Sequence, residues 1–181
     1  MARFNKQEFI KQQKQLIEEQ MAFARSLHSI DIHTLEKRPN SKAWNTLECL
    51  DHMAKSMSVY GNQLKQLNLN GNSEVKISIG LKGRFFAEGM RPKGEKISYK
   101  MKTMKNLEPQ EGEVSLNIQS FIDELSVFDQ FIDQNINSNW NGVKITSAVG
   151  PLVKFNIAES INFLLAHNSR HILQAKKAME S

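Results

Sequence analysis

The stretch IAESINFLLAHNSRHILQAKKAM, residues 157–179, decides the fold of this chain. Its apolar residues recur every three or four positions, which predicts an amphipathic helix. The same stretch carries His167 and His171, which are four residues apart. Side chains at this spacing lie one above the other on a helix, so the two imidazoles can converge on one point. Because imidazole is the most common protein ligand of metal ions, the stretch predicts two ligands of a divalent metal site.

Three further stretches show helical spacing, over residues 5–30, 45–67 and 115–136. The second begins with a capping-box pattern, in which Asn45 is followed by Glu48 three residues later. The expected inner faces are Phe9, Gln13, Leu16, Gln20, Phe23, Leu27 and Ile30 in the first helix, Leu47, Leu50, Ala54, Met57, Gly61, Leu64 and Leu67 in the second, and Ile118, Phe121, Ile122, Leu125, Phe128 and Ile132 in the third.

Residues 73–109 give a weak signal between the second and third helices. Val75, Ile77 and Ile79 alternate as a short strand does, and residues 81–88 predict one or two helical turns. A long connection of this kind inside a compact domain is either functional or poorly ordered. Four helices, one long connection and no convincing sheet predict an all-α four-helix bundle.

The composition bounds the class of protein. A chain of 181 residues with 40% hydrophobic and 24% charged residues is typical of one soluble globular domain, here residues 1–181. It has no apolar run long enough for a membrane span and no apolar signal segment at its start. Cys49 is the only cysteine, so an intrachain disulfide is impossible. These features predict a bacterial-type cytoplasmic protein that does not bind membranes.

The net charge of +5 is unevenly distributed along the sequence. Between residues 76 and 105, nine Lys and Arg residues stand against two acids, Glu88 and Glu95. This segment is either a flap that attracts phosphate or carboxylate groups or a solvated lysine-rich loop. The sequence shows no zinc finger, RNA-binding aromatic motif or helix-turn-helix spacing, so we expect no nucleic-acid partner.

Among the remaining histidines, His52 is the candidate for a third ligand. It lies in the second predicted helix, in WNTLECLDHM (residues 44–53), whereas His28 and His33 fall at the end of the first helix and are expected on the surface. The combination of WxxxECLxH with HNSRHxxQ (residues 167–174) resembles the DinB-like superfamily of four-helix bundles. The resemblance covers essentially the whole chain, including the long middle connection and the Gly-Pro pair at 150–151.

This resemblance implies a fold and a ligand set. The fold is an up-down-down-up bundle with the long connection between its second and third helices. By the likeness, His52, His167 and His171 match the family's three histidines that bind a divalent metal. Nitrogen ligands suit zinc, nickel or iron, and copper as well. The alternative is that His52 is a solvated helix residue and that His167 and His171 are paired surface histidines or hydrogen-bonded ones.

Helical phase indicates where such a site lies. At 100° per residue, His52 points about 160° away from Leu50 and its apolar stripe. We therefore expect the three histidines in a groove at the side or mouth of the bundle, open to water. A site of this kind favours a catalytic metal, which keeps coordination positions free, over a structural one.

Three neighbouring residues have two possible roles each. Glu48 orients His52 through the second ring nitrogen or serves the capping box alone. Cys49 approaches the metal or is a small buried hydrophobe. Arg170 binds the carboxylate of a substrate or cofactor through a bidentate contact, or it is an ordinary solvent-exposed arginine.

The resemblance implies metal-assisted chemistry on a small molecule. In one form, the metal stabilises the thiolate of a low-molecular-weight thiol for a transferase reaction, and the basic segment helps to hold an acidic thiol. In the other form, the metal activates water for hydrolysis. The competing hypothesis is a stress-response protein that binds a metal or ligand without turnover. Bundles of this kind often pair, so we also expect a homodimer.

Overall fold

The computed structural model describes residues 2–69, 75–97, 103–110, 114–150 and 152–181, and most of them are helical. Four long helices dominate the fold: α1 (Lys6–Ser26), α3 (Thr46–Leu64), α5 (Val114–Gln134) and α6 (Ile157–Met179). They match the four predicted helical stretches, with ends that shift by a few residues. Within the described ranges, none of the helices combines the length and the hydropathy that a membrane crossing requires.

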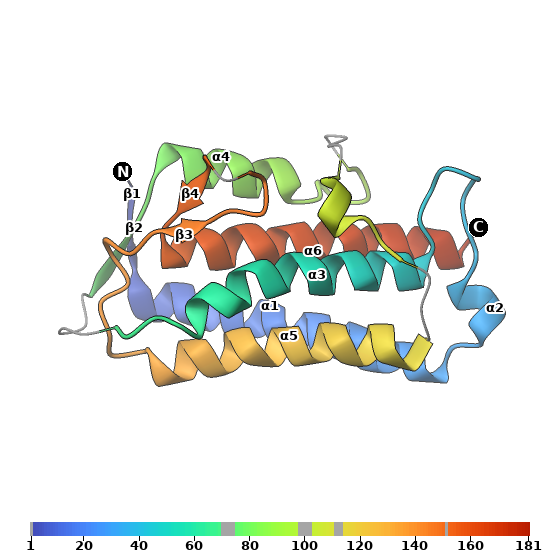
Figure 1. The fold of residues 1–181 in the computed structure, drawn as a ribbon, viewed down its shortest axis with the longest axis horizontal. Helices are drawn as coiled ribbons and strands as arrows, with labels where there is room; N and C mark the ends of the chain where they lie inside the picture. The colour runs from blue at the N-terminus through green and yellow to red at the C-terminus, as the bar shows by residue number, and fades with distance from the viewer. Residues whose placement is uncertain (1, 70–74, 98–102, 111–113, 151) are drawn as a thin grey trace.

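The four long helices lie side by side (Figure 1). α1 packs against α5 and α6, and α3 packs against the same two helices, so the contacts close a ring. Following the colour from blue to red, α1 and α6 run in one direction and α3 and α5 in the other. Because α3 and α5 are parallel neighbours, the chain that joins them must return along the length of the molecule.

The ends of the helices are fixed by side-chain caps. The predicted capping box is confirmed: Asn45 accepts from the Glu48 N–H at 2.8 Å, and Glu48 accepts from the Asn45 N–H at 2.9 Å. A second box, which the sequence analysis did not identify, starts α6: Asn156 and Glu159 exchange the same two bonds, each at 2.8 Å. α3 and α6 therefore both start at defined residues, which fixes the phase of the histidines that they carry.

The expectation of no sheet is wrong in detail, because two small antiparallel sheets cover one end of the ring. β1 (Ala2–Asn5) pairs with β2 (Lys76–Ile79), and β3 (Ile145–Thr146) pairs with β4 (Lys154–Phe155). β2 confirms the predicted alternating strand. The first predicted helix also ends early, and a 3₁₀ turn (Leu27–Ser29) and a short helix, α2 (Ile32–Leu35), follow it.

The inner face of α1 differs in phase from the predicted one. Ile10, Ile17 and Ala24 are buried beside the predicted Phe9, Gln13, Gln20 and Leu27, whereas Leu16 and Phe23 are half-buried and Ile30 is exposed. The reason is that α1 packs against two helices, α5 and α6, so its buried face is wider than one stripe.

The middle connection is an ordered layer over α6 where the structure describes it. It contains α4 (Leu81–Met90), longer than the predicted one or two turns, and a 3₁₀ turn, η2 (Lys105–Leu107). α4 packs along α6. The contact is close at Gly83, where a Cβ atom would lie 2.5 Å from Cγ of Glu159. The Glu159 carboxylate also accepts the Gly80 N–H at 2.7 Å, so the start of α4 is anchored to the start of α6.

Candidate metal centre

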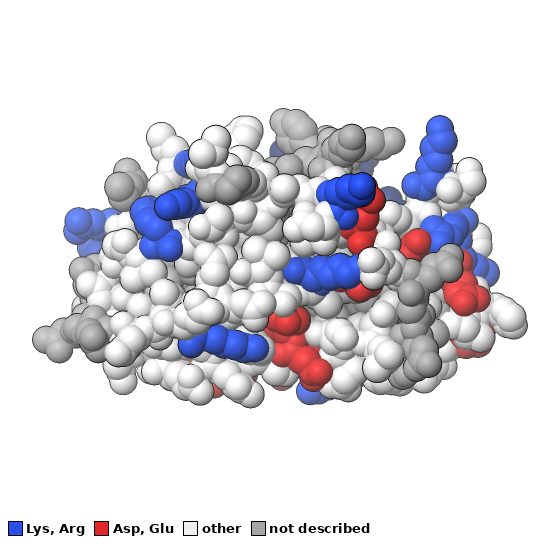
Figure 2. Space-filling model, viewed as in Figure 1, with Lys and Arg blue, Asp and Glu red and all other residues white. Residues whose placement is uncertain are grey.

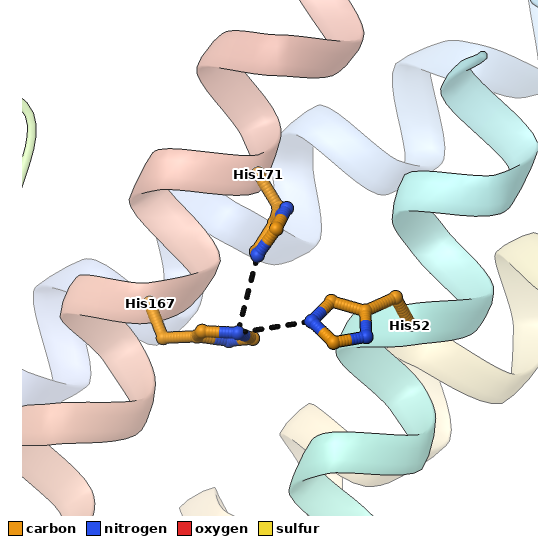
Figure 3. A group of neighbouring side chains, drawn as sticks. All are labelled: His52, His167 and His171. Atoms are coloured by element: carbon orange, nitrogen blue, oxygen red, sulfur yellow. Dashed lines mark hydrogen bonds between the residues drawn. The ribbon is translucent and has the colours of Figure 1, made fainter. Parts of the chain in front are cut away.

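Three histidines from two helices converge in the interior (Figure 3). His52 lies on α3, and His167 and His171 lie on α6. The Nε2 atom of His167 is 3.1 Å from the Nε2 atoms of both His52 and His171. One nitrogen from each residue lies within 4.8 Å of the other two, and all three side chains are buried. The predicted residues therefore form a cluster that could hold a metal ion.

The ring of His52 is oriented by the backbone of the middle connection. Its Nδ1 atom lies 2.7 Å from the carbonyl oxygen of Leu107 in η2. A carbonyl only accepts hydrogen bonds, so Nδ1 carries the hydrogen and Nε2 presents a lone pair to the other histidines. The suggested orienting role of Glu48 is wrong. Glu48 serves the capping box and forms a two-bond ion pair with Arg38, at 2.6 and 2.8 Å.

If all three imidazoles are neutral, their Nε2 atoms cannot all be paired with one another by hydrogen bonds. With the lone pair of His52 facing the cluster, a hydrogen on Nε2 of His167 serves only one neighbour well. The Nδ1 atoms of His167 and His171 are buried and form no hydrogen bond of good geometry among the described residues, although the Asn168 and Gln174 side chains are close enough to favour their protonation. A cation among the Nε2 atoms would use all three lone pairs at once, so the donor set fits a divalent transition metal.

Burial keeps these imidazoles neutral. It lowers the pKa of His167 to about 3, and the nearby His52 adds to the shift. The pKa of His171 falls well below its usual value, mainly through burial and then through the other two histidines, with the Gln174 side chain opposing the shift. The pKa of His52 is also lowered by burial, against the Leu107 hydrogen bond. All three are therefore unprotonated at neutral pH, as metal binding requires.

The metal-free protein is expected to lose stability as the pH falls below about 6.5. Between the lowered folded pKa of His167, about 3, and the ordinary value of 6.5 in the unfolded chain, the unfolded state binds more protons. Stability therefore rises with pH across this window, by up to about 1.4 kcal/mol per pH unit for one fully shifted histidine.

Thermal melting in chelator at a series of pH values measures this slope. His167→Gln is expected to make the slope shallower, because one of the three shifted histidines is removed, whereas His33→Gln, at an exposed position, is the control. An unchanged slope in His167→Gln would show that other groups cause the acid sensitivity.

A cavity of about 800 Å³ adjoins the three histidines. α3 and α6 form one wall of this cavity, and the loop before α3, including Trp44, forms another. Its roof consists of residues from the middle connection: Met90, Ile97, Thr103, Met104 and Leu107. The cavity has exposed residues such as Asn40 and Lys177 in its lining, as expected of a groove, but the histidines themselves are more buried than expected. His52 is only 5% exposed, because α6 and the roof cover the face of α3 that lies opposite its apolar stripe.

Among the described residues, three cationic side chains line the cavity, and the sequence analysis named only one of them, Arg170. Arg170 is buried and lines the cavity, so it is not the ordinary solvent-exposed arginine. Lys42 and Lys177 also line the cavity, and no Asp or Glu does so among the described residues. None of the described Lys and Arg residues between 76 and 105 lines it, whereas Lys100 and Lys102 lie outside the described residues. Figure 2 shows the basic side chains of one face in several separate groups.

The other candidates have structural positions. Cys49 is fully buried, and burial raises the pKa of its thiol to about 12, so it is a small core residue. His28 and His33 are exposed, as expected. Sequence reasoning missed Leu107 and Ser56. A backbone carbonyl carries no sequence signal, but the position of Ser56, one turn beyond His52 on α3, could have identified it as a neighbour.

Comparisons of the chain with protein-family models, with curated proteins and with solved structures gave no match.

Proposed function

We propose that the protein is a DinB-like four-helix bundle that binds one divalent metal ion through His52, His167 and His171 and acts on a small molecule. The observation that carries this proposal is the convergence of three buried Nε2 atoms beside a cavity. The directions of the four long helices and the long connection before α5 agree with the family's pattern. A volume of about 800 Å³ is within the range of small-molecule sites.

Different residues would bind the metal, bind the substrate and exclude water. Three histidines leave room in the coordination shell for a substrate or water. When bound, the ion supplies positive charge that lowers the pKa of a small thiol or of water. Arg170 would bind an anionic group of the substrate or thiol cofactor through its guanidinium. The roof would exclude bulk water and thereby strengthen both interactions.

The lining of the cavity favours thiol transfer over hydrolysis. Metalloproteases of the HExxH type use a glutamate beside the metal as general base, and no Asp or Glu is among the described residues that line this cavity. A thiol whose pKa is lowered needs no separate base to become a nucleophile at neutral pH. We therefore place thiol-dependent S-transferase chemistry first and metal-assisted hydrolysis second.

The test is to incubate zinc-, nickel- or iron-loaded protein with cysteine as the thiol and chlorodinitrobenzene as the electrophile. We expect metal-dependent formation of the thioether, lost in His167→Ala and retained in the exposed-site variant His33→Ala. In parallel, nitrophenyl acetate without thiol reports hydrolysis. Metal-dependent ester cleavage alone would favour the hydrolase. A metal-loaded protein that catalyses neither reaction would favour a non-catalytic binding protein.

A further inference from the structure

The cavity has two chemically different ends along α6. α3 and α6 run antiparallel, and two contacts fix their register: His52 meets His167, and the Tyr60 and Phe163 ring centroids are 6.4 Å apart. From the histidine cluster, the cavity therefore extends toward Tyr60 and Phe163 in one direction. Arg170 lies on α6 between His167 and His171, and beyond it the cavity follows α6 past Gln174 to Lys177.

The lining of the cavity at the Tyr60–Phe163 end is mainly apolar. Both side chains are buried, and Met90 and Val149 line the cavity with them. The polar tip of Tyr60 is already engaged, because its hydroxyl lies 2.7 Å from Ser147 Oγ and accepts the Ala148 N–H at 3.1 Å. This end therefore suits an apolar group, which gains free energy by leaving water.

The opposite end carries positive charge. Lys42 and Lys177 line it, Arg170 lines its junction with the histidine cluster, and the described lining residues include no Asp or Glu. Arg170 is 7% exposed, so a charge near its guanidinium is only weakly screened by water. Lys177 is fixed in place by a 2.6 Å bond from Nζ to the Glu95 carbonyl oxygen. An anionic group is the natural occupant of this end.

Between the two ends of the cavity, Ser56 provides a third possible contact with a ligand. It lies on α3 one turn beyond His52 in the direction of Tyr60, is 3% exposed, and lines the cavity. Its Oγ atom is buried and has no hydrogen-bond partner among the described residues. Serines inside helices often bond to the carbonyl four residues earlier, but Ser56 does not. A buried hydroxyl without a partner is costly, which points to a ligand that supplies one.

We propose that the cavity binds an elongated organic acid in one orientation, with its anionic group at Arg170, its apolar end between Tyr60 and Phe163, and a polar group between them in contact with Ser56 Oγ. Because Ser56 is one turn from His52 and Arg170 lies between His167 and His171, the ligand passes beside the three histidines, and in this respect the inference rests on the proposed function. Arg170 and Phe163 are seven residues apart on α6, so the two ends of the ligand are separated by about 10 Å.

The test uses three related probes with the zinc-loaded protein. Benzoylpropionate has a carboxylate, a ketone and a phenyl ring in the required order, phenylbutyrate lacks the ketone, and phenylbutyramide also lacks the charge. By titration calorimetry, we expect benzoylpropionate to bind roughly fivefold more tightly than phenylbutyrate, and phenylbutyrate roughly tenfold more tightly than the amide. Equal affinities for the acid and the amide would overturn the inference.

Variants assign each preference to a residue. Arg170→Gln is expected to remove the preference for the acid, and Arg170→Lys, which keeps the charge, to retain part of it. Ser56→Ala is expected to remove the preference for the ketone while raising the melting temperature of the ligand-free protein, because it removes an unpartnered hydroxyl. Ser58→Ala is the matched control, since Ser58 lies on the same helix but does not line the cavity.

The outcomes separate this inference from the proposed function. An acid preference that survives in Arg170→Gln would place the carboxylate at the metal and overturn the proposed orientation. A ketone preference that survives in Ser56→Ala would overturn the third contact. Metal content is measured on the same samples. Protein that takes up no metal on loading but still discriminates among the probes would support the inference and contradict the proposed function. Protein that takes up metal but does not discriminate would support the metal site and contradict the inference.

Discussion

Protein purified without chelator is expected to contain one divalent metal ion per chain, and His167→Ala is expected to contain none. His167 contacts both other histidines at 3.1 Å, so its loss removes the central ligand of the three. We expect affinity to fall by more than about a hundredfold, since even residues that only support a ligand contribute 10- to 100-fold. Elemental analysis by mass spectrometry measures the metal content.

Thermal melting gives a second measure of the same effect. An ion at about 100 times its dissociation constant adds about 2.7 kcal/mol to the stability of the folded state, so chelator should lower the melting temperature of the wild type but not of His167→Ala. His33→Ala controls for the loss of an exposed imidazole, and helical circular dichroism controls for folding. A wild-type protein that takes up no zinc, nickel or iron would refute the metal centre.

Gly83→Ala is expected to destabilise the protein, although alanine normally favours a helix over glycine by about 1 kcal/mol. A Cβ atom at this position would lie 2.5 Å from Cγ and 2.7 Å from Cδ of Glu159. Glu159 cannot move freely, because its carboxylate accepts the N–H groups of both Asn156 and Gly80. Overpacking of this kind costs about 1–3 kcal/mol, more than the helical gain. Urea unfolding measures the difference.

Gly89→Ala in the same helix is the matched control. Nothing lies within 4 Å of a Cβ atom at this position, so alanine should stabilise the protein by about 0.5–1 kcal/mol. Opposite signs for the two substitutions would show that α4 packs closely on α6 at Gly83. Stabilisation by both would contradict that contact.

The long helices were predictable from the sequence because their signals are local. Apolar spacing identified all four, and the Asn45–Glu48 pair located the start of α3 to the residue. Local spacing also placed His167 and His171 on one face. The meeting of His52 with this pair joins residues 115 positions apart, and periodicity contains no information about such a contact. Only the family resemblance suggested it.

The burial of the site was not predictable, because apolar spacing identifies only the apolar face of a helix and not a second, more polar face that other elements cover. α3 has two buried faces: the apolar stripe with Leu50, and the face with His52, Ser56 and Tyr60 that α6 and the roof cover. The sequence of the roof has only weak helical and strand patterns. The position of α4 depends instead on contacts of Gly80 and Gly83 with Glu159, which is distant in the sequence. The run of nine basic residues drew attention to this segment, but Lys82, Arg84 and Lys93 among them face solvent. The homodimer and the cytoplasmic location stay predictions.

The hydrogen bond between Leu107 and His52 would couple the position of η2 to the affinity of the three histidines for a metal. The Leu107 carbonyl holds His52 in the tautomer that a metal needs, so a chain with its roof displaced must bind the ion more weakly. Thermodynamic linkage then requires the ion to favour the closed roof by the same free energy. Metal loading should accordingly slow amide hydrogen exchange and proteolytic cleavage near residues 103–110.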